Sequence, residues 1–379
     1  VTMKQTICAA LALACIGAGA AMSPPAAGAE AVASRASTPQ NAADPAVLSA
    51  ELAAHLDAIG FSGTLLVARG DDVLLREAVN ASPADGAEPV GTDTRFPIAS
   101  MSKSFTAALV LALVDEGRIG LDQTLAALLP GFIAGYADRV TLRQMLQNRS
   151  GIPHYIDIPG WFDTDVKAAF TEDSFLAALA ALDLSFEPGS DYLYSNTNYY
   201  LLARIIDRHA GMPYEAFLQT RILDPLGLAD TGQIQDAAPQ SLATGYLADE
   251  AGEYSIVPVT NPALFRGTAS MYSTIDDLHR WGQAVIDGTV YSTAAAAAVF
   301  DSDRPMAWET GQLPLGDDRV TPATYYNGRL IGYLSLILLL PDEDGIVVVL
   351  NNNTAGYRNM LLIASTLAAD QFGQTPADE

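Results

Sequence analysis

Two hydrophobic β-hairpin patterns lie at opposite ends of this chain, and their placement limits the folds that the sequence can adopt. Near the start, residues 63–68 and 73–78 are β-rich runs separated by a Gly/Asp turn. Near the end, residues 330–340 and 345–350 flank a second turn that contains Pro341. Hairpins at both ends with helical patterns between them indicate that the two ends share one antiparallel sheet.

Helical patterns flank these hairpins and fill the chain between them. Apolar residues recur at three- and four-residue spacing over 47–59, and residues 358–372 have the pattern of a closing helix. From Ser100 to about residue 229 the chain is rich in Ala and Leu and is interrupted by Pro-Gly pairs. The sequence therefore predicts an α+β fold: an antiparallel sheet of N- and C-terminal segments, flanked by helices, beside a mostly helical subdomain at roughly 116–240.

The first residues have the pattern of an export signal. Lys4 is followed by an apolar stretch, and the small residues Ala27-Gly28-Ala29 come next. The stretch is shorter than the ~20 residues that a membrane-spanning helix needs. We therefore expect a cleaved signal peptide at 1–29, an exported protein (periplasmic or secreted) and no transmembrane anchor after cleavage. Lipid attachment at Cys15 is the less favoured alternative.

Two further divisions of the chain follow from composition. Residues 30–44 are rich in Ala, Ser and Pro without apolar periodicity, which predicts a flexible linker, and a folded domain is expected at 45–376. Both cysteines, Cys8 and Cys15, lie in the expected signal, so the mature chain is expected to have no disulfide and no catalytic thiol.

The charge balance excludes one class of partner. The chain has 44 acidic and 20 basic side chains and a formal net charge of −24, whereas a nucleic-acid binder normally carries a basic face. Lysine is scarce: only Lys4, Lys103 and Lys167 occur. A lysine within a motif therefore deserves a functional interpretation.

The first chemical motif is the pair Ser100 and Lys103, at the start of the longest helical pattern. Residues three apart on a helix share one face, with Cβ atoms about 5–6 Å apart. A serine hydroxyl is a weak nucleophile at neutral pH, and a lysine whose pKa is lowered by burial can remove its proton. The apolar helix that follows Lys103 is expected to bury it. By chance alone, Ser-x-x-Lys also occurs in many helices.

The second motif is Tyr194-Ser195-Asn196, which follows a Pro-Gly turn. A phenol can relay a proton, and an amide can orient a lysine or donate to a substrate carbonyl. His154, in a loop after Pro153, is a further candidate to lie near a cleft. The other three histidines fit structural or solvated positions.

With these motifs and the order of the segments around them, the chain resembles the serine β-lactamase and penicillin-binding-protein superfamily. The likeness is greatest to the branch that contains class C β-lactamases and D-alanyl-D-alanine carboxypeptidases, with esterases and D-amino-acid peptidases. It implies a catalytic domain at 45–376 that transfers acyl groups. Ser100 would be the nucleophile, Lys103 and Tyr194 would share the acid and base work, and Asn196 would position substrate and lysine. How the proton is divided between Lys103 and Tyr194 stays open.

The chain departs from this family at the strand that flanks the cleft. Where the family usually has Lys-Thr-Gly or His-x-Gly, the sequence has Tyr326-Asn327-Gly328. The resemblance implies that the backbone N–H groups of Arg329 and Ser100 bind the oxyanion. Tyr326 carries no positive charge near neutral pH, so it weakens the β-lactamase and carboxypeptidase assignments. The guanidinium of Arg329 or of Arg266 is the alternative source of that charge.

The resulting hypothesis is an exported serine hydrolase that acts on a D-amino-acid peptide, a β-lactam or a small ester. No metal or cofactor is expected; the expected partner is a small-molecule or peptide substrate, and the oligomeric state stays open. A non-catalytic or slowly deacylating penicillin-binding or sensor domain is the main alternative. A Ser-His-Asp esterase is more remote, because the sequence has no Gly-x-Ser-x-Gly elbow.

Overall fold

The computed structural model describes residues 48–81, 88–161, 171–234, 241–248, 254–257, 262–300, 304–316, 319–353 and 359–373. The expected signal peptide and linker lie outside these ranges, as does Lys167. The boundaries of the domain and of the helical subdomain stay predictions.

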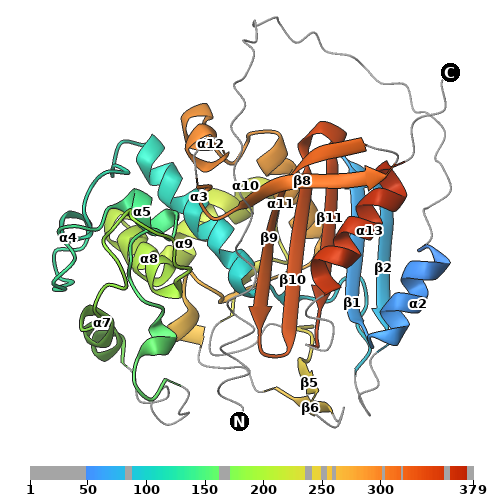
Figure 1. The fold of residues 1–379 in the computed structure, drawn as a ribbon, viewed down its shortest axis with the longest axis horizontal. Coiled ribbons are helices and arrows are strands. Elements are labelled where there is room, and N and C mark those ends of the chain that lie inside the picture. Colours follow the sequence, from blue (N-terminus) through green and yellow to red (C-terminus); the bar gives the residue numbers. More distant parts are fainter. Residues whose placement is uncertain are drawn as a thin grey trace, which may run out of the picture. The chain divides into compact units, whose positions relative to one another are not determined.

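One antiparallel sheet joins the beginning and the end of the described chain (Figure 1). Its strands are β1 (Ser62–Arg69), β2 (Asp72–Asn80), β8 (Glu309–Gly316), β9 (Arg319–Leu330), β10 (Tyr333–Leu340) and β11 (Gly345–Asn351). Their order is β2-β1-β11-β10-β9-β8, and β1 pairs with β11 from Gly63 opposite Asn351 to Arg69 opposite Gly345. The predicted fold class is confirmed.

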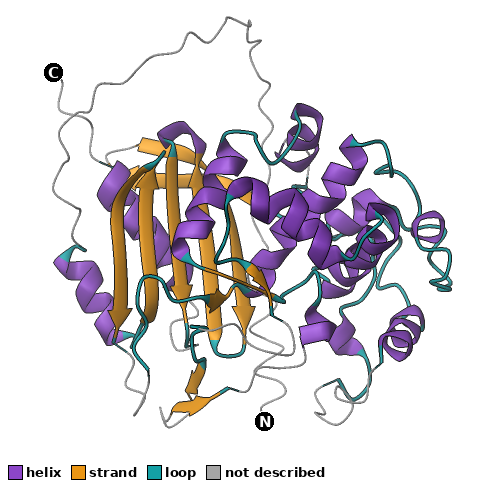
Figure 2. Ribbon diagram, turned by 180° about the vertical axis from the view of Figure 1, so that it is seen from behind, coloured by secondary structure: helices purple, strands orange, loops and turns teal. Residues whose placement is uncertain are grey.

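Both faces of this sheet are buried. Leu65 and Val67 of β1 face one core, while Leu66 and Ala68 face the other. The first core is closed by α2 (Ala50–Ala58) and α13 (Met360–Phe372), and α11 (Ile275–Ile286) lies on the opposite face (Figures 1 and 2). Double burial explains why β10 and β11 are almost continuously apolar, since the residues along both strands are buried.

The remaining helices form a region beside the sheet (Figure 2). They are α3 (Ser102–Asp115), α4 (Leu125–Leu128), α5 (Leu142–Leu146), α7 (Glu172–Ala180), α8 (Asn196–Ala210), α9 (Tyr214–Leu218), α10 (Asp224–Leu226) and α12 (Thr293–Phe300). Short strands also occur: β3 (Phe96–Pro97), β4 (Gly232–Gln233), β5 (Tyr246–Ala248), β6 (Tyr254–Ile256) and β7 (Met271–Ser273). Of these helices, α3 is buried over nearly its whole length and packs against α8, as its apolar sequence requires.

A strand and a helix in the C-terminal part begin later than the sequence predicts. The strand expected at 330–340 begins at Tyr333, because Leu330 ends β9 and the chain turns at Gly332, whose φ is +84°. The closing helix begins at Met360. None of the described helices is long and apolar enough to cross a membrane.

Candidate active site

Ser100 lies in a tight turn that leads directly into α3. The 3-10 turn Ala99–Met101 (η1) continues into Ser102, and Ala99 has a φ of +50°, a conformation that non-glycine residues rarely adopt. Hydrogen bonds hold the turn: Ser335 Oγ donates to Ile98 O (2.7 Å) and Ser102 Oγ donates to Ala99 O (2.7 Å). The nucleophile candidate therefore has a fixed position at the N-terminal end of a helix.

Lys103 is completely buried beside Ser100. Its side chain is 0% exposed, and its Nζ lies 2.9 Å from Ser100 Oγ and 2.8 Å from the carbonyl oxygen of Thr268. Burial lowers the pKa of the Lys103 amine well below its ordinary value, because desolvation penalises the ammonium form. The structure thus brings the two predicted residues together in the geometry that proton transfer requires.

Tyr194 approaches Ser100 from the segment that precedes α8. Its hydroxyl donates to Ser100 Oγ at 2.8 Å and is also hydrogen-bonded to Tyr326. Burial raises the pKa of Tyr194 to about 12, so the phenol keeps its proton at neutral pH. Ser100 therefore lies between an amine that favours its neutral form and a phenol that favours its protonated form.

Asn196 is the first residue of α8, and its amide contacts a neighbouring tyrosine. Asn196 Nδ2 donates to the hydroxyl of Tyr155 at 2.9 Å, and that hydroxyl lies 3.4 Å from Thr268 Oγ1. The Oδ1 atom of Asn196 is buried without a hydrogen-bond partner among the described residues. Asn196 is thus connected to the peptide segment that binds Lys103, and its direct positioning of lysine and substrate stays a prediction.

Strand β9 brings its Tyr326-Asn327-Gly328 segment against the turn that carries Ser100. A Cβ atom at residue 328 would lie 2.2 Å from Ile98 O and 3.0 Å from Ser100 N, so only glycine permits this approach. Tyr326 is 7% exposed, and its ring lies edge-on to Trp308 at 6.2 Å between centroids. Arg329 has an exposed side chain on the same strand. The oxyanion role of the Ser100 and Arg329 N–H groups stays a prediction.

Arg266 does not supply the positive charge that is missing at Tyr326. Its guanidinium binds Asp207 (2.5 and 2.7 Å) and Glu215 (2.6 and 2.8 Å). These ion pairs commit the Arg266 guanidinium to Asp207 and Glu215, which disfavours this alternative from the sequence. Arg266 instead ties α8 to α9.

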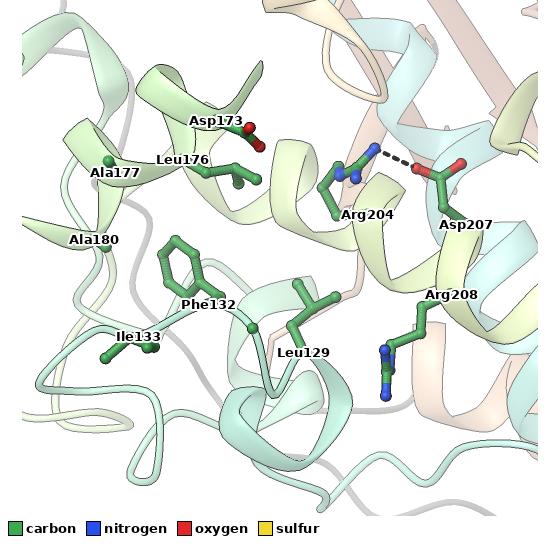
Figure 3. Close-up of a pocket in the computed structure, with 11 residues that line it drawn as sticks. Leu129, Phe132, Ile133, Asp173, Leu176, Ala177, Ala180, Arg204, Asp207 and Arg208 are labelled. Atoms are coloured by element: carbon green, nitrogen blue, oxygen red, sulfur yellow. Dashed lines mark hydrogen bonds and ion pairs between the residues drawn. The ribbon is translucent and has the colours of Figure 1, made fainter. Parts of the chain in front are cut away.

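The described cavity in Figure 3 lies away from these groups. It has a volume of about 710 Å³ between the segment that follows α4, helix α7 and the end of α8. Its walls include Leu129, Phe132 and Leu176, and the charged Arg204 and Asp207 are paired at 2.8 Å. None of the predicted site residues lines it. Within the described ranges, no group of three or more His, Cys, Asp or Glu side chains has the geometry of a metal site.

Sequence reasoning missed Thr268 and Tyr155. Thr268 acts through its backbone carbonyl, which carries no signal in the residue type, and it is 165 positions from Lys103. The only local signal is Gly267, whose φ is +72° and whose Cβ would lie 2.8 Å from Tyr199 O. Tyr155 belongs to an aromatic cluster with Trp161 and Phe175, a pattern that the sequence does not distinguish from ordinary core packing.

Comparison with known proteins identifies relatives of this arrangement. The Bacillus subtilis (strain 168) protein named penicillin-binding protein 4* is 30% identical over 315 residues, covering 77% of this chain and 68% of that protein. A D-aminopeptidase from Brucella anthropi is 32% identical over 231 residues, which are 61% of this chain but only 43% of the enzyme. The chain thus spans less than half the length of that D-aminopeptidase.

A solved structure and a family model complete the comparison. The structure of a D-stereospecific amidohydrolase from Streptomyces sp. superposes with a TM-score of 0.70 at 24% identity, covering 86% of this chain and 99% of the other, which establishes the shared fold. The sequence model of the family described as Beta-lactamase matches residues 48–369. The chain therefore belongs to the β-lactamase family of serine hydrolases.

Proposed function

We propose that this protein is an exported hydrolase that forms an acyl-enzyme through Ser100 on amide or ester substrates. The observation that supports it most strongly is the contact of Ser100 Oγ with two proton-carrying groups, Lys103 Nζ at 2.9 Å and Tyr194 OH at 2.8 Å. Acyl transfer needs a base for the nucleophile and an acid for the leaving group, and these two side chains provide one of each.

The pKa shifts favour a division of labour in the acylation step. Neutral Lys103 takes the proton of Ser100 as Oγ attacks the substrate carbonyl carbon, and the backbone N–H groups of Ser100 and Arg329 stabilise the oxyanion. Tyr194 then gives its proton to the leaving nitrogen or oxygen and regains one from the Lys103 ammonium. The products of this step are the free leaving group and an ester of Ser100, which water hydrolyses.

The substrate class that we favour is an amide or peptide of a D-amino acid, or a small ester. Two of the relatives carry D-specific names, a D-aminopeptidase and a D-stereospecific amidohydrolase. Tyr326 has a raised pKa and is neutral at physiological pH, and Arg266 is neutralised by its two carboxylates. Both features argue against substrates whose carboxylate would have to bind a positive charge at position 326. A β-lactam is still to be tested as an acylating substrate.

Covalent labelling tests the acyl-enzyme. A fluorescent penicillin or a fluorophosphonate is expected to label the wild type on Ser100 and not to label Ser100→Ala. The same two proteins are then assayed with a D-alanyl p-nitroanilide, a short p-nitrophenyl ester, a chromogenic cephalosporin and a D-alanyl-D-alanine peptide. Absence of both labelling and turnover contradicts the proposal. Labelling without turnover identifies the slowly deacylating binding protein instead.

Export is tested separately from catalysis. The charged, apolar and small-residue order of positions 1–29 supports a cleavable signal. When the full chain is expressed in a bacterial host, we expect the protein in the periplasm or the medium to begin at Glu30. Recovery of the uncleaved chain from the cytoplasm contradicts export.

A further inference from the structure

A rigid turn beside Tyr194 carries a side chain that the acylation mechanism does not use. The turn runs from Ser150 to Tyr155 and is held by the start of α8. Ser195 Oγ and Thr197 Oγ1 both donate to the carbonyl oxygen of Pro153, at 2.9 and 2.7 Å. Because Ser195 directly follows Tyr194, these bonds fix the turn relative to the catalytic phenol.

A second set of contacts holds the beginning of the same turn. Ser150 Oγ donates to Asn198 Oδ1 of α8 at 2.7 Å. Gly151 has a φ of +76°, and a Cβ there would lie 2.3 Å from Phe186 O, so the turn packs closely against residue 186 at a position that only glycine can occupy. A side chain presented by this turn is therefore preorganised, as a substrate-binding group should be.

The turn presents His154 next to the reacting groups. The His154 ring lies 4.7 Å from the Tyr155 ring in an edge-on arrangement and 6.3 Å from the Tyr194 ring, between centroids. His154 Nδ1 accepts a hydrogen bond from the backbone N–H of Ile156 at 3.1 Å. A nitrogen that accepts carries no proton, so the neutral ring carries its proton on Nε2.

The charge state of His154 is set by its surroundings. Burial, and then the nearby Lys103, lower the pKa of His154 to about 3. The imidazole is therefore neutral at physiological pH, and its Nε2–H is a constant, uncharged donor.

No hydrogen bond joins His154 Nε2 to another described residue. This atom is also not one of the fully buried polar atoms without a partner, so it is open to solvent. Two other histidines differ: Nε2 of His209 lies 3.0 Å from Leu128 O, and Nε2 of His279 lies 2.8 Å from Gly70 O. His154 thus keeps an accessible N–H beside Tyr194, where those histidines use theirs for folding.

We infer that His154 binds substrate by donating its Nε2–H to a second carbonyl oxygen of the acyl group, close to the carbonyl that Ser100 attacks. The inference rests on the proposed acyl-enzyme function and narrows its substrate class. An uncharged donor pairs with a carbonyl oxygen and gives nothing to an ammonium group, which is itself a donor. The preferred substrates are thus N-acylated or peptidyl amino acids, whose nitrogen bears a carbonyl, over amino acids with a free ammonium group.

Two esters with the same leaving group test this inference. The p-nitrophenyl ester of N-acetyl-D-alanine carries the extra carbonyl, and p-nitrophenyl propanoate lacks the acetamido group. In His154→Phe, which keeps an aromatic ring against Tyr155 and Tyr194, we expect the ratio of kcat/KM for the two esters to fall about tenfold, mainly through KM. One hydrogen bond of about 1.4 kcal/mol corresponds to that factor.

Three further variants make the outcome decisive. His154→Gln offers an amide donor and should restore part of the ratio. His154→Asn keeps an acceptor for the Ile156 N–H, but its shorter side chain cannot place a donor where Nε2 lies. It takes the place of the Phe variant if that variant is unstable. His279→Gln, on α11, should leave the ratio unchanged. An unchanged ratio in both His154→Phe and His154→Asn overturns the inference, whereas a wild type that cleaves neither ester and takes no label on Ser100 overturns the acyl-enzyme proposal instead.

Discussion

Lys103 illustrates how the surroundings of a buried side chain shift its protonation equilibrium. Its Nζ contacts two neutral oxygens, Ser100 Oγ and Thr268 O, and no carboxylate lies in an ion pair with it in the described part of the chain. An adjacent carboxylate would stabilise the ammonium and raise the pKa of the amine. Full burial lowers the pKa of the amine and its neutral partners do not offset that shift, which favours the form that can accept a proton.

At the residue scale, Tyr326 is the position where the sequence departs from the motif that the family resemblance implies. We expect Tyr326→Phe to lower kcat about fivefold with little change in KM. The substitution keeps the packing against Trp308 but removes the hydrogen bond to Tyr194, which contributes about 1 kcal/mol to holding the phenol over Ser100. Steady-state kinetics on a p-nitrophenyl ester measures the effect.

The neighbouring tyrosine provides the matched control for this change. Tyr325 follows the alternation of β9 to the opposite face of the sheet, where it packs against the core closed by α2 and α13. Tyr325→Phe should therefore leave kcat within a factor of two. Equal losses in the two variants would mean that Tyr326 acts only through the stability of β9.

At the element scale, the contact that matters most for the candidate site is the approach of β9 to the turn that carries Ser100. In Gly328→Ala the new methyl group would lie 2.2 Å from Ile98 O and 2.4 Å from Ser335 Oγ, so either β9 or the turn must move. Because a shift of about 1 Å at the reacting groups costs on the order of 100-fold in rate, we expect kcat/KM to fall by at least that factor. Ester kinetics with thermal melting checks this prediction.

A second glycine in the same sheet distinguishes strand propensity from the local clash. Gly311 lies on β8, and a Cβ there would meet no atom within 4 Å. Gly311→Ala should retain activity and melt at or slightly above the wild-type temperature, since it lowers the entropy of the unfolded chain. Full activity in Gly328→Ala would show that β9 is not needed in its present position.

The same elements show how far sequence patterns reach. The strands at 345–350 and 73–78 were predictable because double burial or a clear turn leaves a strong pattern, and Ser100, Lys103 and Tyr194 were predictable as candidates because their chemistry depends on side chains. Strand β8 was not, because its Gly and Pro residues weaken the strand signal. The contact of the Thr268 carbonyl with Lys103 could not be predicted, because every residue type has a backbone carbonyl.

At the scale of the whole molecule, the candidate site lies where the sheet meets the helical region. Ser100 follows the first hairpin, Tyr194 precedes α8, Thr268 comes from a loop before β7, and Gly328 belongs to the C-terminal part of the sheet. The site therefore forms only when both ends of the chain have joined in one sheet. Activity and global folding should respond together to conditions that disturb any of these segments.

Acid is one such condition, and His154 makes its effect measurable. The pKa of His154 is about 3 in the folded chain and about 6.5 when unfolded. Between these values the unfolded chain binds a proton that the folded chain excludes, so stability falls as the pH is lowered from about 6.5 towards 3. The loss is at most about 1.4 kcal/mol per pH unit, and less because the ring is partly open to solvent.

Comparison with His154→Asn isolates this contribution from the rest of the molecule. The 44 acidic side chains also titrate as the pH falls, but they are common to both proteins and cancel in the difference. We expect urea denaturation at pH 7.5, 6.0 and 4.5 to show the wild type losing its stability advantage over His154→Asn as the pH decreases. A difference that does not change with pH would mean that the folded chain protonates His154 as readily as the unfolded chain does, so that burial does not keep its ring neutral below about pH 6.5.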